Sequence, residues 1–291
     1  MNNTTKHIKI IECPRDAMQG LKTFVPTQNK IDYIQLLLSV GFDTIDFGSF
    51  VSPKAIPQMA DTQQVVKKLD LSKTQSKLLA IVANERGANE AIDFQEITYL
   101  GYPFSISENF QMRNTHKTIS ESIKTLDYIK NKTEKSGKEL VVYLSMGFGN
   151  PYGDPWNEEI VEQWVALLSE KNIQIISLSD TIGSADSQSI KNIFTHLIPK
   201  YPTIEFGAHF HTSVHNWHEK VYSAYTAGCV RFDGAIRGYG GCPMAKDELV
   251  GNMPTEKLLS YFQKMKAETG LNLLAFESSY NEAMKIFEKS I

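Results

Sequence analysis

The chain has 291 residues, a formal net charge of −3 at pH 7 and 42% hydrophobic residues. This length and composition suffice for a large core, and an α/β barrel often fills such a length as one domain. Because the charges show no basic stripe, we expect no nucleic-acid partner. No apolar run approaches the length of about 20 residues that a membrane-spanning helix needs.

The N-terminal segment MNNTTKHIKI has neither an apolar signal region nor an arginine-rich character. Cys13, Cys229 and Cys242 are too few for a disulfide framework. These features favour the cytoplasm as the compartment.

Eight short apolar, β-branched runs alternate with longer stretches of helical periodicity. The runs lie at residues 7–12, 42–47, 77–83, 96–101, 139–145, 173–179, 204–210 and 229–235. Nearly continuous apolar runs are typical of parallel strands that are buried on both faces. We therefore predict an α/β fold of the (β/α)8 TIM-barrel type. The alternative is a doubly wound open sheet, but no G-x-G-x-x-G follows the first run.

Two of the intervening stretches, 28–41 and 157–172, show clear amphipathic periodicity. Gly41 and Gly228 stand where helices are expected to stop. No linker divides the chain, so we expect one catalytic domain over 1–291, with about 255–291 as a C-terminal helical extension. The predicted inner faces consist of Ile31, Ile34, Leu37 and Leu38 in the first helix and of Ile160, Trp164, Leu167 and Leu168 in the second.

Polar side chains cluster where the predicted strands end, which is where TIM barrels carry their catalytic groups. Strand seven ends in His209 and His211, and these side chains share a face because residues i and i+2 of a strand point the same way. Two imidazoles so placed either bond to nearby backbone or bind a divalent metal. The other strand-end candidates are Arg15, Asp16 and Gln19 after strand one, Asp46 at strand two, Ser179, Asp180 and Thr181 at strand six, and Cys242 after strand eight.

Asp16 favours the metal interpretation of the two histidines. In a closed barrel, strand one neighbours strand eight and lies near strand seven, so a carboxylate and two imidazoles can meet. Arg15 beside it is either part of a surface ion pair or a fixed cation for an oxyanion. His215 and His218 follow at helical spacing, and we expect them on a solvated surface.

Cys242 lies in the glycine-rich loop YGGCP, either as a small turn residue or as a thiol that exchanges a proton. Cys229 is expected in the core, and Cys13 is given no role.

The chain resembles hydroxymethylglutaryl-CoA lyases from residue 7 to about 265. The motifs that carry the resemblance are P-R-D-x-x-Q at 14–19, S-F-V-S-P-K-x-x-P-Q-M at 49–59, S-E-x-x-x-x-x-N at 107–114, S-L-x-D-T-I-G at 177–183, H-x-H at 209–211 and G-x-G-G-C-P at 238–243. The resemblance implies metal-dependent cleavage of 3-hydroxy-3-methylglutaryl-CoA to acetyl-CoA and acetoacetate. It implies Mg²⁺ or Mn²⁺ as cofactor, an acyl-CoA as substrate partner and a homo-oligomer, a dimer.

The resemblance also implies roles for individual residues. Asp16, His209, His211 and Asn252 would bind the cation, and His209 or Asp16 would take the substrate's hydroxyl proton. Arg15 would stabilise the enolate and Cys242 would protonate it. Substrate contacts are expected from Arg15, Gln19, Asp46, Ser179, Asp180 and Thr181.

Several positions depart from the family pattern. Aligned without a gap, Cys13 stands where the family has glycine and Ile11 where it has glutamate, and Asp46 replaces a glutamate. Thr212-Ser213 replaces Asp-Thr, Met244 replaces tyrosine, and one extra residue separates Cys242 from Asn252. With these departures, the resemblance indicates the reaction type more firmly than the exact acyl group.

Other functions remain open from the sequence. A Claisen-condensing synthase of the isopropylmalate or homocitrate kind would share the Arg-Asp and H-x-H motifs, but not the YGGCP loop. A lyase for a related 3-hydroxyacyl-CoA, a pyruvate-utilising aldolase and a catalytically silent barrel are the remaining alternatives.

Overall fold

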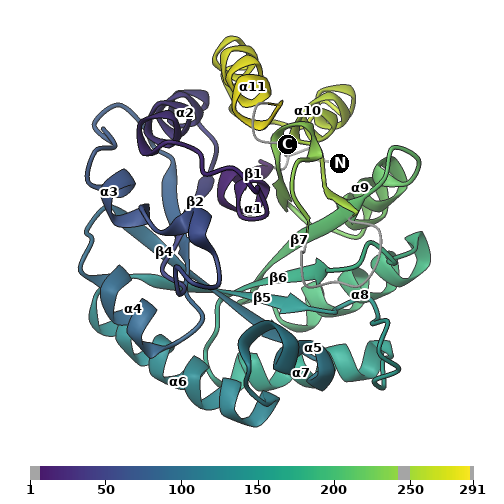
Figure 1. The fold of residues 1–291 in the computed structure, drawn as a ribbon. Coiled ribbons are helices and arrows are strands. Elements are labelled where there is room, and N and C mark those ends of the chain that lie inside the picture. Colours follow the sequence, from purple (N-terminus) through teal and green to yellow (C-terminus); the bar gives the residue numbers. More distant parts are fainter. Residues whose placement is uncertain (1–6, 242–249, 289–291) are drawn as a thin grey trace.

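Eight strands, β1 to β8, pair in parallel with their neighbours, and β8 also pairs with β1, which closes the sheet into a barrel. The computed structural model describes residues 7–241 and 250–288. The helices surround this sheet, and the short α1 lies over one end of it (Figure 1). The predicted (β/α)8 TIM barrel is confirmed.

The strands keep the order in which the sequence presents them. A ninth strand of two residues runs antiparallel to β7. The bounds are β1 Lys9–Glu12, β2 Thr44–Ser49, β3 Lys77–Ile81, β4 Ile97–Ser105, β5 Glu139–Ser145, β6 Ile175–Asp180, β7 Glu205–Thr212, β8 Arg231–Gly234 and β9 Gly251–Asn252.

The helices alternate with these strands. Their bounds are α1 Pro14–Met18, α2 Thr27–Val40, α3 Thr62–Val66, α4 Glu85–Ile92, α5 Glu108–Thr115, α6 Ile119–Lys135, α7 Glu158–Glu170, α8 Ser187–Lys200, α9 Trp217–Thr226, α10 Thr255–Lys264 and α11 Leu273–Glu288, with 3₁₀ turns η1 Pro57–Met59 and η2 Ile236–Gly238. Every helix within the described ranges is too short or too polar to span a membrane.

Alternation along the strands separates two apolar regions. The larger one fills the space between the sheet and the helices. A smaller one occupies the barrel interior and contains Leu79, Ile81, Tyr99, Val141, Tyr143 and Ile175. Because strand side chains alternate between these regions, the residues at the strand ends face either the barrel axis or the helices.

The predicted inner face of α2 is confirmed, since Ile31, Ile34, Leu37 and Leu38 are all buried. Gly41 ends that helix in the left-handed conformation, with φ 86°. The predicted face of α7 is partly wrong. Val161, Val165 and Leu168 are its buried residues, while Ile160, Trp164 and Leu167 are only partly covered. The apolar arc of α7 is wide, and the helix turns its Val161–Val165 side toward the sheet.

Two helices follow the last barrel strand. α10 packs against β8 and α9, and therefore takes the place of the eighth barrel helix. α11 lies outside the barrel repeat and packs against α2, where Tyr33 and Phe287 meet edge to face at 6.2 Å. The helical extension thus consists of one barrel helix and one additional helix (Figure 1).

Candidate metal and substrate site

Asp16, His209 and His211 meet at the C-terminal end of the barrel. One ligand atom from each lies within 4.8 Å of the others. Asp16 comes from α1, directly after β1, and both histidines come from β7. Asp16 and His211 are buried, and the His209 side chain is 14% exposed. The strand-end rule therefore brings together the three residues that the sequence singled out.

Each imidazole of the cluster is oriented through its Nδ1 atom. His209 Nδ1 lies 3.0 Å from Asp233 Oδ2, and His211 Nδ1 lies 2.8 Å from the carbonyl oxygen of Thr181. An imidazole whose Nδ1–H is donated presents Nε2 as its free lone pair. Both rings can therefore offer Nε2 to one cation beside Asp16.

Asn252 joins this cluster through the short strand β9, in which it pairs with His211 of β7. Its Nδ2 donates to Asp16 Oδ2 at 2.7 Å and to the carbonyl oxygen of Tyr239 at 2.9 Å. Because both N–H bonds of the amide are used, its carbonyl oxygen Oδ1 is the atom that can serve a cation. The pairing of β9 with β7 thus places a fourth donor atom, the amide oxygen of Asn252, at the cluster.

Arg15 lies beside the cluster and is held by carboxylates on two sides. Its Nε and Nη2 donate to the Asp46 carboxylate, with Nη2 2.5 Å from Oδ2. Its Nη1 donates to Asp16 Oδ1 and to Gln19 Oε1, each at 3.0 Å. Among the described residues, these bonds leave one N–H of Nη2 without an acceptor. That N–H is available to an oxyanion at the barrel end.

Burial and neighbouring charges set the protonation of the cluster. Burial raises the pKa of Asp16, but the charges of Arg15, His209 and His211 and the hydrogen bond from Asn252 together outweigh it, so the net pKa lies below its usual value. Burial, together with the charge of His209, lowers the pKa of His211 to about 4. At neutral pH the site therefore contains a carboxylate and a neutral imidazole, which are the ligand forms that a divalent cation requires.

Two further shifts have the opposite sign. Burial lowers the pKa of His209, but its hydrogen bond to Asp233 and the charge of that carboxylate raise the net value above the usual one. Burial raises the pKa of Asp46 to about 6 in spite of its contacts with Arg15.

The strand-six candidates divide between two sides of the sheet. Ser179 Oγ donates to the carbonyl oxygen of Ser177, and Thr181 Oγ1 accepts from the Met146 amide at 2.8 Å. The Asp180 carboxylate accepts instead from the Ala185 amide at 3.1 Å and from Lys220 Nζ at 2.5 Å. Asp180 is therefore bonded to the helix layer, and Thr181 reaches the cluster through its carbonyl oxygen.

Gly240, in the described part of the glycine-rich loop, lies against the cluster. Gly240 has φ 89°, and a Cβ placed on it would lie 2.7 Å from the Asp16 carbonyl oxygen and 2.8 Å from Asn252 Nδ2. Only glycine fits this approach and this backbone conformation. Cys242, two residues further on, lies outside the described residues.

A family model described as HMGL-like matches residues 7–281. The chain belongs to the HMGL-like family. It is 32% identical to a hydroxymethylglutaryl-CoA lyase of Bacillus subtilis over 89% of this chain and 86% of that protein. It is 27% identical to a 3-hydroxy-3-isohexenylglutaryl-CoA/hydroxymethylglutaryl-CoA lyase of Pseudomonas aeruginosa, over 99% of this chain and 95% of that one.

The similarity to a solved structure extends over nearly the whole chain. An HMG-CoA lyase of Acinetobacter baumannii, in complex with coenzyme A and 3-methylmalate, superimposes with a TM-score of 0.91 at 29% identity. The match covers 98% of this chain and 93% of that one. The predicted family is therefore confirmed.

Sequence reasoning missed two residues next to the cluster of this HMGL-like protein. Asp233 bonds to His209, and Lys220 is a fully buried lysine that bonds to Asp180. Asp233 lies in β8, where the alternation of side chains could have indicated that it faces the barrel interior. No such signal was available for Lys220, which lies on α9. His215 and His218 are exposed as expected, but His215 precedes α9, which begins at Trp217.

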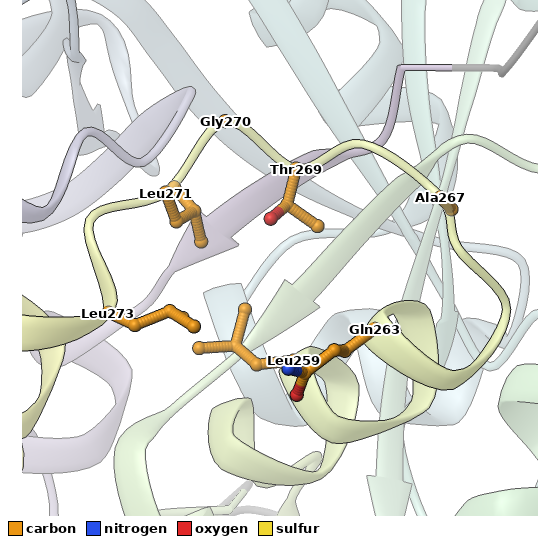
Figure 2. Close-up of a pocket in the computed structure, with 7 residues that line it drawn as sticks. All are labelled: Leu259, Gln263, Ala267, Thr269, Gly270, Leu271 and Leu273. Carbon is orange, nitrogen blue, oxygen red and sulfur yellow. The ribbon is translucent and has the colours of Figure 1, made fainter.

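A surface pocket lies away from the cluster. Figure 2 shows its lining, to which Leu259, Leu271 and Leu273 contribute. It adjoins the start of β1, because Gly270 lies near His7 and the Glu268 carbonyl oxygen accepts from the Ile8 amide. Asp16 follows the other end of β1, so this pocket is not part of the candidate site.

Proposed function

We propose that this HMGL-like protein is a carbon–carbon lyase that cleaves 3-hydroxy-3-methylglutaryl-CoA to acetyl-CoA and acetoacetate with a divalent cation, Mg²⁺ or Mn²⁺. The observation that carries the proposal is the cluster of Asp16, His209 and His211 beside Arg15 at the C-terminal end of the barrel. The family match and the relatives named as lyases support the same reaction.

The chemistry of the donor set fits such a cation. One carboxylate, two imidazoles and the amide oxygen of Asn252 would hold it, and no cysteine belongs to this group of described residues. Hard oxygen and imidazole donors suit Mg²⁺ or Mn²⁺, whereas closed thiolate sets are typical of structural zinc. When bound, the cation would supply Lewis acidity that lowers the pKa of the substrate's C3 hydroxyl.

The chain's own residues carry the proton transfers. Nδ1 of His209 is bonded to Asp233, so its Nε2 cannot both hold a cation and accept a proton. Asp16 Oδ1 accepts from Arg15 and Gln19, and Oδ2 accepts from Asn252, so one acceptor position of this carboxylate remains. We propose His209 or Asp16 as the base that takes the hydroxyl proton. The electrons of the O–H bond form the ketone of acetoacetate, and those of the C2–C3 bond pass to the thioester as an enolate.

Arg15 and Cys242 complete the reaction. The N–H of Arg15 that has no acceptor among the described residues would stabilise the enolate oxygen. Cys242 would donate its thiol proton to C2, and the resulting acetyl-CoA keeps its thioester bond. The loop that carries Gly240 against the cluster would exclude water from the enolate.

Substrate recognition is the finer part of the proposal. The related A. baumannii structure contains coenzyme A and 3-methylmalate, which supports an acyl-CoA substrate here. Gln19 and Asp46 hold Arg15 and would contact the acyl carboxylate through it, and Ser179 and Thr181 would shape the site beside strand six. Because Asp46 replaces a longer glutamate, a related 3-hydroxyacyl group is the alternative substrate. We also propose that the protein forms a homodimer and that it acts in the cytoplasm.

A thiol assay separates this lyase from a condensing synthase. The purified protein with Mg²⁺ is given 3-hydroxy-3-methylglutaryl-CoA in one reaction, and acetyl-CoA with a 2-oxo acid in another. A lyase consumes the first thioester without releasing free coenzyme A thiol, whereas a synthase releases free thiol in the second. Free thiol in the second reaction alone would reject the proposal.

A further inference from the structure

Lys220 of α9 is a buried lysine whose ammonium group is fully bonded. None of its surface is exposed. Its Nζ donates to Asp180 Oδ2 at 2.5 Å, to the carbonyl oxygen of Gly183 at 2.9 Å and to the carbonyl oxygen of His211 at 2.9 Å. An ammonium group has three N–H bonds, so each has one acceptor.

The three acceptors belong to the segments that surround His211. Asp180 is the last residue of β6, Gly183 lies in the turn that follows, and His211 lies in β7. The same turn contains Thr181, whose carbonyl oxygen accepts from His211 Nδ1 at 2.8 Å. Lys220 therefore fixes both the backbone of His211 and the turn that orients the His211 ring.

Stability alone explains this arrangement poorly. A buried ion pair seldom stabilises a fold more than apolar side chains of the same volume, because both charges lose their hydration. The other buried residues of α9 are Val221, Ser223 and Ala224, and none of them carries a charge. What the ammonium provides and a methyl group cannot is a directed bond to the two carbonyl groups.

We propose that Lys220 is a positioning residue for His211, and that it sets the affinity of the cluster for its divalent cation. The inference rests on the proposed metal site. Lys220 contacts neither the cation nor the substrate. It acts by holding the strand-six turn against β7, so that Nε2 of His211 faces Asp16 and His209.

Mn²⁺ affinity of the purified full chain tests this role. Lys220→Met removes the ammonium and keeps the length of the side chain. Because outer residues that orient metal ligands change affinity by about 10–100-fold, we expect the Kd for Mn²⁺ from titration calorimetry to rise by that factor.

Lys30→Met is the matched control. Lys30 is also buried and bonds to Asp61 Oδ1 at 2.7 Å and to the carbonyl oxygen of Gln58, but none of these residues bonds to the cluster. We expect both variants to unfold at lower denaturant concentration, and only Lys220→Met to bind Mn²⁺ more weakly. An unchanged Kd in Lys220→Met would overturn the inference.

A second variant covers the case in which Lys220→Met does not fold. Lys220→Met combined with Asp180→Leu replaces both charges with apolar groups and leaves no unpaired buried carboxylate. It should fold and still bind Mn²⁺ at least about tenfold more weakly. Wild-type affinity in this double variant would overturn the role of Lys220 and leave the proposed metal site standing. Absence of Mn²⁺ binding by the unaltered chain would overturn the metal site and this role together.

Discussion

Asn252 and Asp16 lie 236 residues apart in the chain and are joined by a hydrogen bond of 2.7 Å from Nδ2 to Oδ2. The bond connects β9, after the glycine-rich loop, with α1, after the first strand. It fixes the orientation of the carboxylate and of the amide at once. The cluster is therefore assembled from both ends of the sequence and depends on the whole barrel being closed.

Asn252→Ala should weaken Mn²⁺ binding by about tenfold or more, because the variant loses the amide oxygen and releases the Asp16 carboxylate. Titration calorimetry with Mn²⁺ measures the change. Asn272→Ala is the control, since Asn272 Oδ1 accepts from Leu274 and Ala275 amides at the start of α11 and is not in the cluster. Equal affinities in the two variants would argue against Asn252 as part of the site.

Asp233 orients His209 through a hydrogen bond of 3.0 Å to Nδ1. Removal of that carboxylate in Asp233→Ala frees the ring to rotate and should raise the Kd for Mn²⁺ about 10–100-fold. Asp233→Asn keeps a carbonyl oxygen for the bond and should lose less. The order of the two variants is the informative result: if asparagine is as harmful as alanine, the hydrogen bond is not the reason for the loss.

Cys242→Ala should lower the rate of acetyl-CoA formation by about 10²–10⁴-fold, the usual contribution of a positioned proton donor. Mn²⁺ affinity should stay unchanged, because the thiol is not a ligand in the proposed site. Cys229→Ala is the control, because Cys229 is buried two residues before β8 and its thiol bonds to the Arg231 carbonyl oxygen. A Cys242→Ala variant with normal turnover would assign the proton to another group.

Glu12 gives a prediction for stability against pH. It is fully buried and accepts from the Ile236 amide and from Thr255 Oγ1, and burial raises its pKa from 4.5 to about 8. Since the folded chain holds this proton more tightly than the unfolded chain, the stabilisation is complete below pH 4.5 and is lost as the pH rises to about 8.

Glu12→Gln removes this titration and keeps the size of the side chain. The free energy of unfolding is measured in urea for both proteins. The value for the variant minus the value for the wild type should increase between pH 5 and pH 8, by about 5 kcal/mol or less. Other titrating groups cancel in the difference. A difference that does not change with pH would show that Glu12 is ionised in the folded protein throughout this range.

The sequence predicted the parts of the site that follow from local geometry. Asp16, His209 and His211 stand at strand ends, and the barrel rule together with the i, i+2 spacing places them on one rim. Lys220 and Asp180 could not be paired in this way, because their contact joins a helix to a strand 40 residues earlier across the outer layer. The partner of a buried charge depends on how helices and strands pack, and the hydrophobic periodicity of the sequence does not indicate this.

Asn252 shows the same limit from another direction. The family resemblance named it as a ligand, whereas its antiparallel pairing with His211 became visible only in the fold. The α7 face was misjudged for a simpler reason. Its apolar residues cover a wide arc, and periodicity does not tell which part of such an arc turns toward the sheet.

The most direct test of the central claim is the measurement of products from 3-hydroxy-3-methylglutaryl-CoA. The purified protein is assayed with Mn²⁺, after treatment with a chelator, and after Mn²⁺ has been restored. The account predicts equal amounts of acetyl-CoA and acetoacetate, loss of both with the chelator, and recovery with the cation. A folded protein that binds Mn²⁺ and forms neither product would contradict the account.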